Sequence, residues 1–79
     1  MPAKIAPWLA DALRRERSSR RWSQAELARR ADVDPSHLSE IEGEKRTPNV
    51  ETLEKLCDAL GMPISALFRE AERGRDGRR

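Results

Sequence analysis

The sequence predicts an all-α fold in which five short helices form one small domain. Apolar residues recur at intervals of three and four along most of the chain, a spacing that gives a helix one apolar face. Capping residues, prolines and glycines divide this pattern into five segments, and no segment shows the alternation typical of a strand. With 79 residues, the chain has room for one domain, which excludes a substrate cleft between two.

The first two helices are predicted from their N-terminal signals. Pro7 suits the first turn of a helix that runs to about residue 19. Residues 23–26 form a capping box, in which the Ser23 hydroxyl and the Glu26 carboxylate each accept a hydrogen bond from the other residue's backbone N–H. A second helix therefore begins there. The apolar stripes of these two helices are Leu9, Ala12 and Leu13, followed by Leu27, Ala28 and Ala31.

Capping residues, prolines and a glycine predict three further helices. Asp34 is an N-cap and Pro35 the first residue of a third helix. Residues 50–60 form a fourth helix, which Gly61 closes as a C-terminal cap. Pro63 opens a short fifth helix. The inward-facing residues are Leu38 and Ile41 in the third helix, Val50, Leu53, Leu56, Cys57 and Leu60 in the fourth, and Ile64, Leu67 and Phe68 in the fifth.

These elements divide the chain into three parts. Residues 8–68 are expected to form the folded domain, residues 1–7 an N-terminal arm, and residues 69–79 a charged, flexible tail. No run of about 18 apolar residues suggests a membrane span, and the N-terminus lacks the pattern of a secretory signal. Cys57 is the single cysteine and cannot form an internal disulfide, so we expect a cytoplasmic protein.

The net charge of +2 hides an uneven distribution. Residues 1–30 hold eight Lys/Arg against three Asp/Glu (+5), residues 31–60 hold three against eight (−5), and residues 61–79 hold five against three (+2). Arg supplies thirteen of the sixteen bases, and its planar guanidinium suits phosphate. The distribution by itself fits a solvated surface as well as a nucleic-acid-binding one.

The second and third helices are separated by so few residues that they must meet at a steep angle, as in a helix-turn-helix. The sequence around them resembles the Cro/CI-type helix-turn-helix family, also called XRE. The resemblance covers roughly residues 9–68 and rests on residues 23–28 (SQAELA), 31–33 (ADV), 38–42 (LSEIE), 45–48 (KRTP), 51–53 (ETL) and 59–61 (ALG). It implies a five-helix, lambda-repressor-like domain that regulates transcription as a homodimer on a palindromic operator. Controller proteins and phage-type repressors are built in this way.

The third helix is expected to read DNA bases. Leu38 and Ile41 share one side of it, which leaves Ser36, Ser39 and Glu40 on the opposite side, facing the major groove, with Pro35 at the edge. A carboxylate on this surface is repelled by phosphate unless it accepts a hydrogen bond from cytosine N4 or is held by a neighbouring Arg. Both uses of Glu40 stay open, as does that of a tolerated surface acid.

The resemblance also assigns contacts to the DNA backbone and within the protein. It places the Gln24 amide on a phosphate, at a helix N-terminus that favours anions. Arg17 and Glu42 match a structural ion pair. Met62, Ile64, Leu67 and Phe68 form an incompletely covered apolar cluster, where we expect the dimer interface. The other expected phosphate contacts are Ser23, His37, Lys45, Arg46, Arg20, Arg21 and Asn49.

The sequence departs from the family at four positions. Asp32 occupies a place in the tight turn where the family usually has glycine and where a positive φ is expected, which Asp tolerates better than most residues. Arg21 also occupies a position that is often glycine, and the geometry there stays open. Pro35 and Glu40 replace side chains that commonly contact bases. These two changes bear on sequence specificity.

An enzymatic role is not supported by the sequence. His37 and Cys57 lie on different predicted helices, and no phosphate-binding glycine loop or metal-ligand spacing is present. We therefore expect no metal, no cofactor, no small-molecule ligand and no membrane partner, and a buried, structural Cys57. The main alternative to a DNA-binding regulator is an antitoxin or another protein-interaction module built on the same fold.

Overall fold

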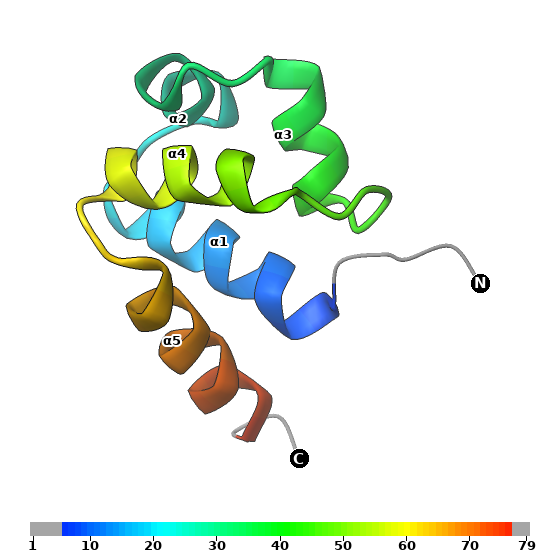
Figure 1. Cartoon of the computed structure of the whole chain (residues 1–79), viewed down its shortest axis with the longest axis vertical. Helices are drawn as coiled ribbons and strands as arrows, with labels where there is room; N and C mark the ends of the chain where they lie inside the picture. The colour runs from blue at the N-terminus through cyan, green and yellow to red at the C-terminus, as the bar shows by residue number, and fades with distance from the viewer. Residues whose placement is uncertain (1–5, 77–79) are drawn as a thin grey trace.

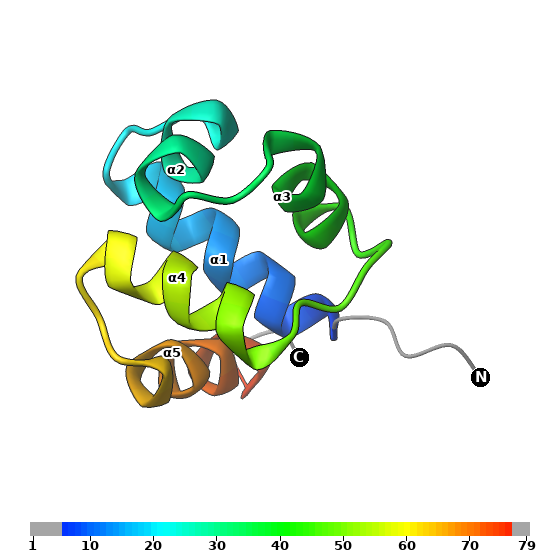
Figure 2. The ribbon, with the colours of Figure 1, turned by 45° about the horizontal axis from the view of Figure 1, so that its top comes forward.

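The chain folds into five α-helices in the predicted order. The computed structural model describes residues 6–76, and no strand occurs within that range. The helices are α1 (Pro7–Ser19), α2 (Gln24–Ala31), α3 (Pro35–Glu42), α4 (Val50–Leu60) and α5 (Ile64–Asp76). In Figures 1 and 2, α1 lies at the centre of the arrangement. It packs against α3 and α5, while α4 packs against α2 and α5.

Side-chain caps begin three of the helices where the sequence predicts them. The Ser23 hydroxyl accepts the Glu26 backbone N–H at 3.0 Å, and Asp34 accepts that of Ser36 at 2.8 Å. The Glu26 carboxylate does not complete the capping box as expected, because it pairs with Arg29 and Arg30 instead. Hydrogen bonds from these two guanidiniums lower the pKa of Glu26. The third cap is the Asn49 side chain, which accepts the Thr52 N–H at 2.8 Å.

Three non-glycine residues adopt the left-handed conformation that favours glycine. They are Arg21 (φ 61°), Asp32 (φ 57°) and Glu44 (φ 64°). Asp32 agrees with the positive φ that its place in the family suggests, whereas the sequence leaves the geometry at Arg21 open and gives no signal for Glu44. Gly61 ends α4 at φ 74°, as its predicted capping role requires.

One hydrophobic core lies between the helices. It contains fully or nearly fully buried residues from all five: Leu9, Ala10, Ala12, Leu13, Leu27, Ala28, Ala31, Leu38, Ile41, Leu53, Leu56, Cys57, Leu60, Leu67 and Ala71. Val50 was expected on the inner face of α4, but it is 69% exposed. As the first residue of α4, it lies at the edge of the packing, where the preceding Pro48 is buried instead.

The fifth helix is longer than the sequence analysis predicts. It continues to Asp76, so residues 69–76, which the sequence predicts as tail, are helical. Ala71 explains the extension: it follows Leu67 by four residues, shares its face, and is fully buried. At the other end, α1 already includes Pro7. The remainder of the predicted arm, residues 1–5, and of the tail, residues 77–79, lies outside the described residues. None of the helices within residues 6–76 is long and apolar enough to cross a membrane.

Candidate nucleic-acid interface

The turn between α2 and α3 fixes how the two helices meet. Asp32, in its left-handed conformation, ends α2, and the Val33 N–H bonds the Ala28 carbonyl at 2.9 Å. Asp34 then caps α3. Three residues, 32–34, therefore connect the two helices, and Figure 2 shows the helices side by side at a steep angle.

The two sides of α3 differ sharply in exposure. Leu38 and Ile41 are fully buried on the inner side. The predicted base-reading residues lie on the outer side: Pro35, Ser36 and Ser39 are exposed, and the Glu40 side chain is 45% exposed. The third helix therefore presents a polar surface that takes no part in the core.

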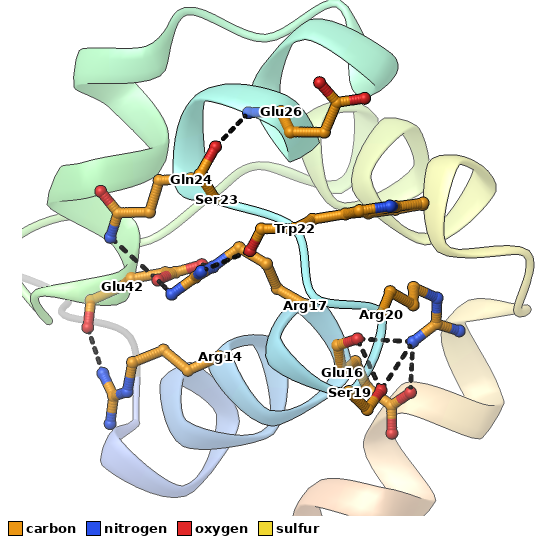
Figure 3. Close-up of polar contacts among 10 residues, drawn as sticks. All are labelled: Arg14, Glu16, Arg17, Ser19, Arg20, Trp22, Ser23, Gln24, Glu26 and Glu42. Atoms are coloured by element: carbon orange, nitrogen blue, oxygen red, sulfur yellow. Dashed lines mark hydrogen bonds and ion pairs between the residues drawn. The ribbon is translucent and has the colours of Figure 1, made fainter.

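A buried carboxylate at the end of α3 ties this helix to α1 and α2. The Glu42 side chain is only 1% exposed. Arg17 donates to both of its oxygens, from Nε to Oε2 at 2.8 Å and from Nη2 to Oε1 at 3.0 Å, so the expected ion pair is present. Gln24 donates from Nε2 to Oε1 at 2.9 Å (Figure 3). Each oxygen of this buried charge thus has a partner, as burial of a charge requires.

Two further contacts of this network were not expected from the sequence. Arg17 also donates from Nη1 to the Trp22 carbonyl at 2.8 Å, which holds the loop before α2. Arg14 donates to the backbone carbonyl of Glu42. The spacing of Arg14 and Arg17, three residues apart on one helix, is a signal that both face the same side. No local sequence pattern indicates that Arg14 would bond a carbonyl 28 residues away.

The loop after α3 brings two of the expected phosphate-binding residues back beside that helix. The backbone N–H of Lys45 bonds the Glu40 carbonyl at 2.8 Å, and Arg46 Nε donates to Glu40 Oε1 at 2.8 Å. Both basic side chains are exposed. His37, on α3, is half-buried, and Ser23 and Asn49 are exposed caps at the starts of α2 and α4.

Arg20 has partners that differ from the phosphate expected for it. It donates to the Glu16 carbonyl and carboxylate and, at 2.6 Å, to the Leu60 carbonyl at the end of α4. In Figure 3 it points away from Gln24 and Glu42. The ring of Trp22 lies 4.2 Å from the Arg30 guanidinium and 6.0 Å from that of Arg20. Arg20 therefore joins helices inside this domain, while Arg21 is exposed in the same loop.

The expected dimer residues separate into buried and accessible ones. Leu67 is fully buried in the domain's own core, which removes it from any exposed patch. Phe68 is 37% exposed, and Met62 and Ile64 are half-buried. Beside them lies a groove of about 380 Å³, lined by Glu16, Met62, Ala66, Arg69, Glu70 and Arg73.

Neither Cys57 nor any acidic cluster forms a reactive centre in the described part of the chain. Cys57 is buried, as expected, and this burial, with a smaller effect of Asp58, raises the pKa of its thiol to about 11. The nucleophilic form of cysteine is the thiolate, and a raised pKa disfavours that form. No group of His, Cys, Asp or Glu within residues 6–76 could hold a metal ion.

The fold and this site define a class of protein. A three-residue turn joins α2 to α3, α3 is capped and has one buried and one polar side, and basic residues lie in the loop after it. Together these features make a helix-turn-helix domain. A family model described as "Helix-turn-helix" matches residues 13–67. The chain belongs to this family, the Cro/CI-type or XRE helix-turn-helix family that its sequence resembles.

Several characterised proteins are similar to the chain. The "Immunity repressor protein" of Bacillus phage phi105 is 37% identical over 54 residues, which are 68% of this chain and 38% of that protein. "Control protein C.MunI" of Mycoplasma sp is 36% identical over 61 residues, 77% of this chain and 80% of that protein. The crystal structure of the clp gene regulator ClgR from Corynebacterium glutamicum has a TM-score of 0.77 and 33% identity, covering 84% of this chain and 70% of that one.

Proposed function

We propose that the protein is a sequence-specific DNA-binding regulator of transcription that inserts α3 into the major groove. The observation that carries this proposal is the polar outer side of α3, formed by Ser36, Ser39 and Glu40 on a helix whose inner side is buried. Such a helix is the base-reading element of helix-turn-helix proteins. Family membership and the names of the relatives, which include a repressor, a control protein and a gene regulator, support it.

Phosphate contacts from both sides of α3 would anchor the domain. Gln24 stands at the N-terminus of α2, where backbone N–H groups favour an anion. Its Nε2 is held by Glu42, which fixes the direction of the amide. Lys45 and Arg46 contribute the positive charge on the other side of α3. Ser23, His37, Asn49 and Arg21 are the further proposed contacts. Arg20 is left out because its guanidinium bonds Glu16 and Leu60.

The charge distribution supports separate roles for α3, which would read bases, and for the flanking residues, which would bind phosphates. Residues 31–60 carry a net charge of −5, so α3 itself adds little electrostatic affinity for DNA. The affinity must come from the basic residues that flank it. Each phosphate contact that is lost should lower the slope of log affinity against log salt by about 0.9.

The regulator is further proposed to act as a homodimer in the cytoplasm. The accessible apolar residues Met62, Ile64 and Phe68 and the adjoining groove form a surface on the α5 side that a second copy could cover. A twofold dimer would place two α3 helices about 34 Å apart, one turn of DNA, and would favour a palindromic operator.

Selection of bound fragments from random double-stranded DNA tests this function. We expect a palindrome of two half-sites to be enriched. The double variant S36A/S39A should lose preference at specific positions, because it changes only the exposed side of α3. Lys45→Ala should weaken binding to all sequences and reduce the salt slope. Failure of the wild-type protein to enrich any sequence would contradict the proposal.

A further inference from the structure

Glu40 is the residue on the outer side of α3 whose presence is hardest to reconcile with DNA binding. Its carboxylate lies among the proposed base-reading residues, where phosphates would repel it. The structure places one cation directly on it: Arg46 Nε lies 2.8 Å from Glu40 Oε1. The pair neutralises the acid at the surface that would face DNA.

The backbone after α3 is shaped so that Arg46 reaches Glu40. The Gly43 N–H bonds the Ser39 carbonyl at 2.9 Å as the helix ends. Glu44 then adopts the left-handed conformation, at φ 64°, which reverses the chain. This reversal lets the Lys45 N–H bond the carbonyl of Glu40 at 2.8 Å. Arg46, the next residue, is thereby held beside the last turn of α3.

Folding stability does not account for the pair. The side chains of Glu40 and Arg46 are 45% and 57% exposed, and ion pairs as exposed as this one contribute little to stability. Only Nε of Arg46 bonds the carboxylate. The two terminal nitrogens of Arg46 and Oε2 of Glu40 are therefore available to a ligand that approaches α3 from outside.

We propose that Glu40 and Arg46 act as one unit that selects a cytosine in each half-site, an inference that rests on the proposed function. Arg46 binds a phosphate through its terminal nitrogens while its Nε positions Glu40. Glu40 Oε2 then accepts a hydrogen bond from N4 of cytosine. In the major groove, guanine presents the acceptors O6 and N7, thymine presents O4, and adenine presents N7 beside its N6 donor, and each of these acceptors repels a carboxylate. Cytosine presents the N4 donor, so it fits a carboxylate best. Glu40 reads the base, and Arg46 is its positioning residue.

The unit is tested by repeating the selection from random DNA with three variants. Glu40→Ala should remove the preference for cytosine at one position of each half-site, a loss of about 10-fold in discrimination. Glu40→Gln should shift that position toward adenine, because an amide pairs with N6 and N7 of adenine. Arg46→Lys should keep the salt slope, since the charge remains, but relax the same position.

Arg29→Lys provides a matched control. Arg29 also forms an ion pair at the protein surface, with Glu26 on α2, so its substitution should leave the base preference unchanged. Thermal unfolding of each variant checks that the fold is retained.

Two results would overturn the inference, and they differ from failure of the proposed function. If the wild-type protein enriches a palindrome but Glu40→Ala and Arg46→Lys keep every base preference, the unit does not exist. If Glu40→Ala raises affinity equally for all sequences, Glu40 only repels DNA. If the wild-type protein enriches no sequence, the proposed function fails, and this inference with it.

Discussion

Glu42 is the residue that determines how α3 is held. Its carboxylate lies in the interior and accepts hydrogen bonds from Arg17 in α1 and Gln24 in α2. A buried ion pair adds less stability than its attraction suggests, because both charges lose their hydration. Removing one partner is nevertheless costly, since the other charge is left buried without compensation.

We expect Glu42→Ala to lower the free energy of unfolding by about 3 to 5 kcal/mol, because Arg17 would lose both carboxylate contacts. Urea unfolding followed by circular dichroism measures the change. Glu40→Ala, which removes an exposed carboxylate two residues away, should stay within about 0.5 kcal/mol of the wild-type protein. Similar values for the two variants would mean that the Arg17 pair does not stabilise the fold.

Backbone conformation at single residues gives a second prediction. A β-carbon at Gly61 would meet no atom within 4 Å, so a substitution there is strained by the positive φ and not by crowding. Gly61→Ala should therefore destabilise the protein by about 1 kcal/mol. Arg21→Gly should stabilise it by a similar amount, because Arg21 already carries the strain of φ 61°.

Thermal unfolding measures both changes, and about 1 kcal/mol corresponds to a shift of about 4 to 8 °C for a domain of this size. Shifts of the same sign for Gly61→Ala and Arg21→Gly would contradict the explanation by backbone strain.

Among the elements, α5 differs most from its sequence-based prediction. It packs on α1 along its length, and Ala71 continues the buried face begun by Leu67. Gly74, one turn further on, lies so close to Arg15 of α1 that an added β-carbon would overlap Nη2 of that side chain. The last turns of α5 are therefore part of the folded domain.

Substitutions in α5 test whether these turns support the fold. Ala71→Glu should lower the free energy of unfolding by about 3 kcal/mol or more, because it places a charge without a partner in the α1–α5 contact. Glu72→Ala, at the neighbouring exposed position, should change it by less than about 0.5 kcal/mol. An Ala71→Glu variant as stable as the wild-type protein would show that Ala71 does not pack against α1 as described.

The sequence is informative about helix starts and less so about contacts between distant residues. Ser23 and Asp34 mark helix starts correctly because a cap bonds a backbone N–H two or three residues away. The end of α5 depends on packing against α1, and an alanine in a charged segment is a weak signal of burial. The partners of charged side chains are harder still to predict. From the sequence, Arg20 could pair with a phosphate, with Glu16 or with the Leu60 carbonyl, and the choice depends on how the helices pack.

In the candidate site, too, local features could be predicted from the sequence and contacts between distant residues could not. The outer side of α3 follows from helical periodicity, because burial of Leu38 and Ile41 leaves the other side exposed. The contact between Gln24 and Glu42 and the return of Arg46 to Glu40 do not follow from periodicity. They depend on the relative placement of two helices and on the conformation of Glu44.

At the scale of the whole molecule, large apolar side chains are exposed in two separate places within residues 6–74. Phe68 lies on α5 and Val50 at the start of α4. Ile64, four residues before Phe68 on α5, and Met62, just before that helix, are half-buried, whereas Val50 follows the basic loop after α3. The α5 side is therefore the better candidate for association between two copies.

We expect Phe68→Glu to weaken self-association, because two like charges would meet at the proposed twofold contact. Sedimentation equilibrium over a range of protein concentrations measures the dissociation constant. Val50→Glu provides the control and should leave association unchanged. Monomeric behaviour of the wild-type protein at tens of micromolar, with and without operator DNA, would contradict the dimer.

The two-sided character of α3 separates what the domain recognises from what keeps it folded. Leu38, Ile41 and Glu42 fix the helix from within, while Ser36 and Ser39 touch nothing that the core requires. New side chains at the outer positions therefore leave the scaffold intact. A single scaffold of this kind can acquire a new binding preference through one or two codon changes, and a gene duplication followed by such changes would yield two regulators that no longer compete for the same sequence.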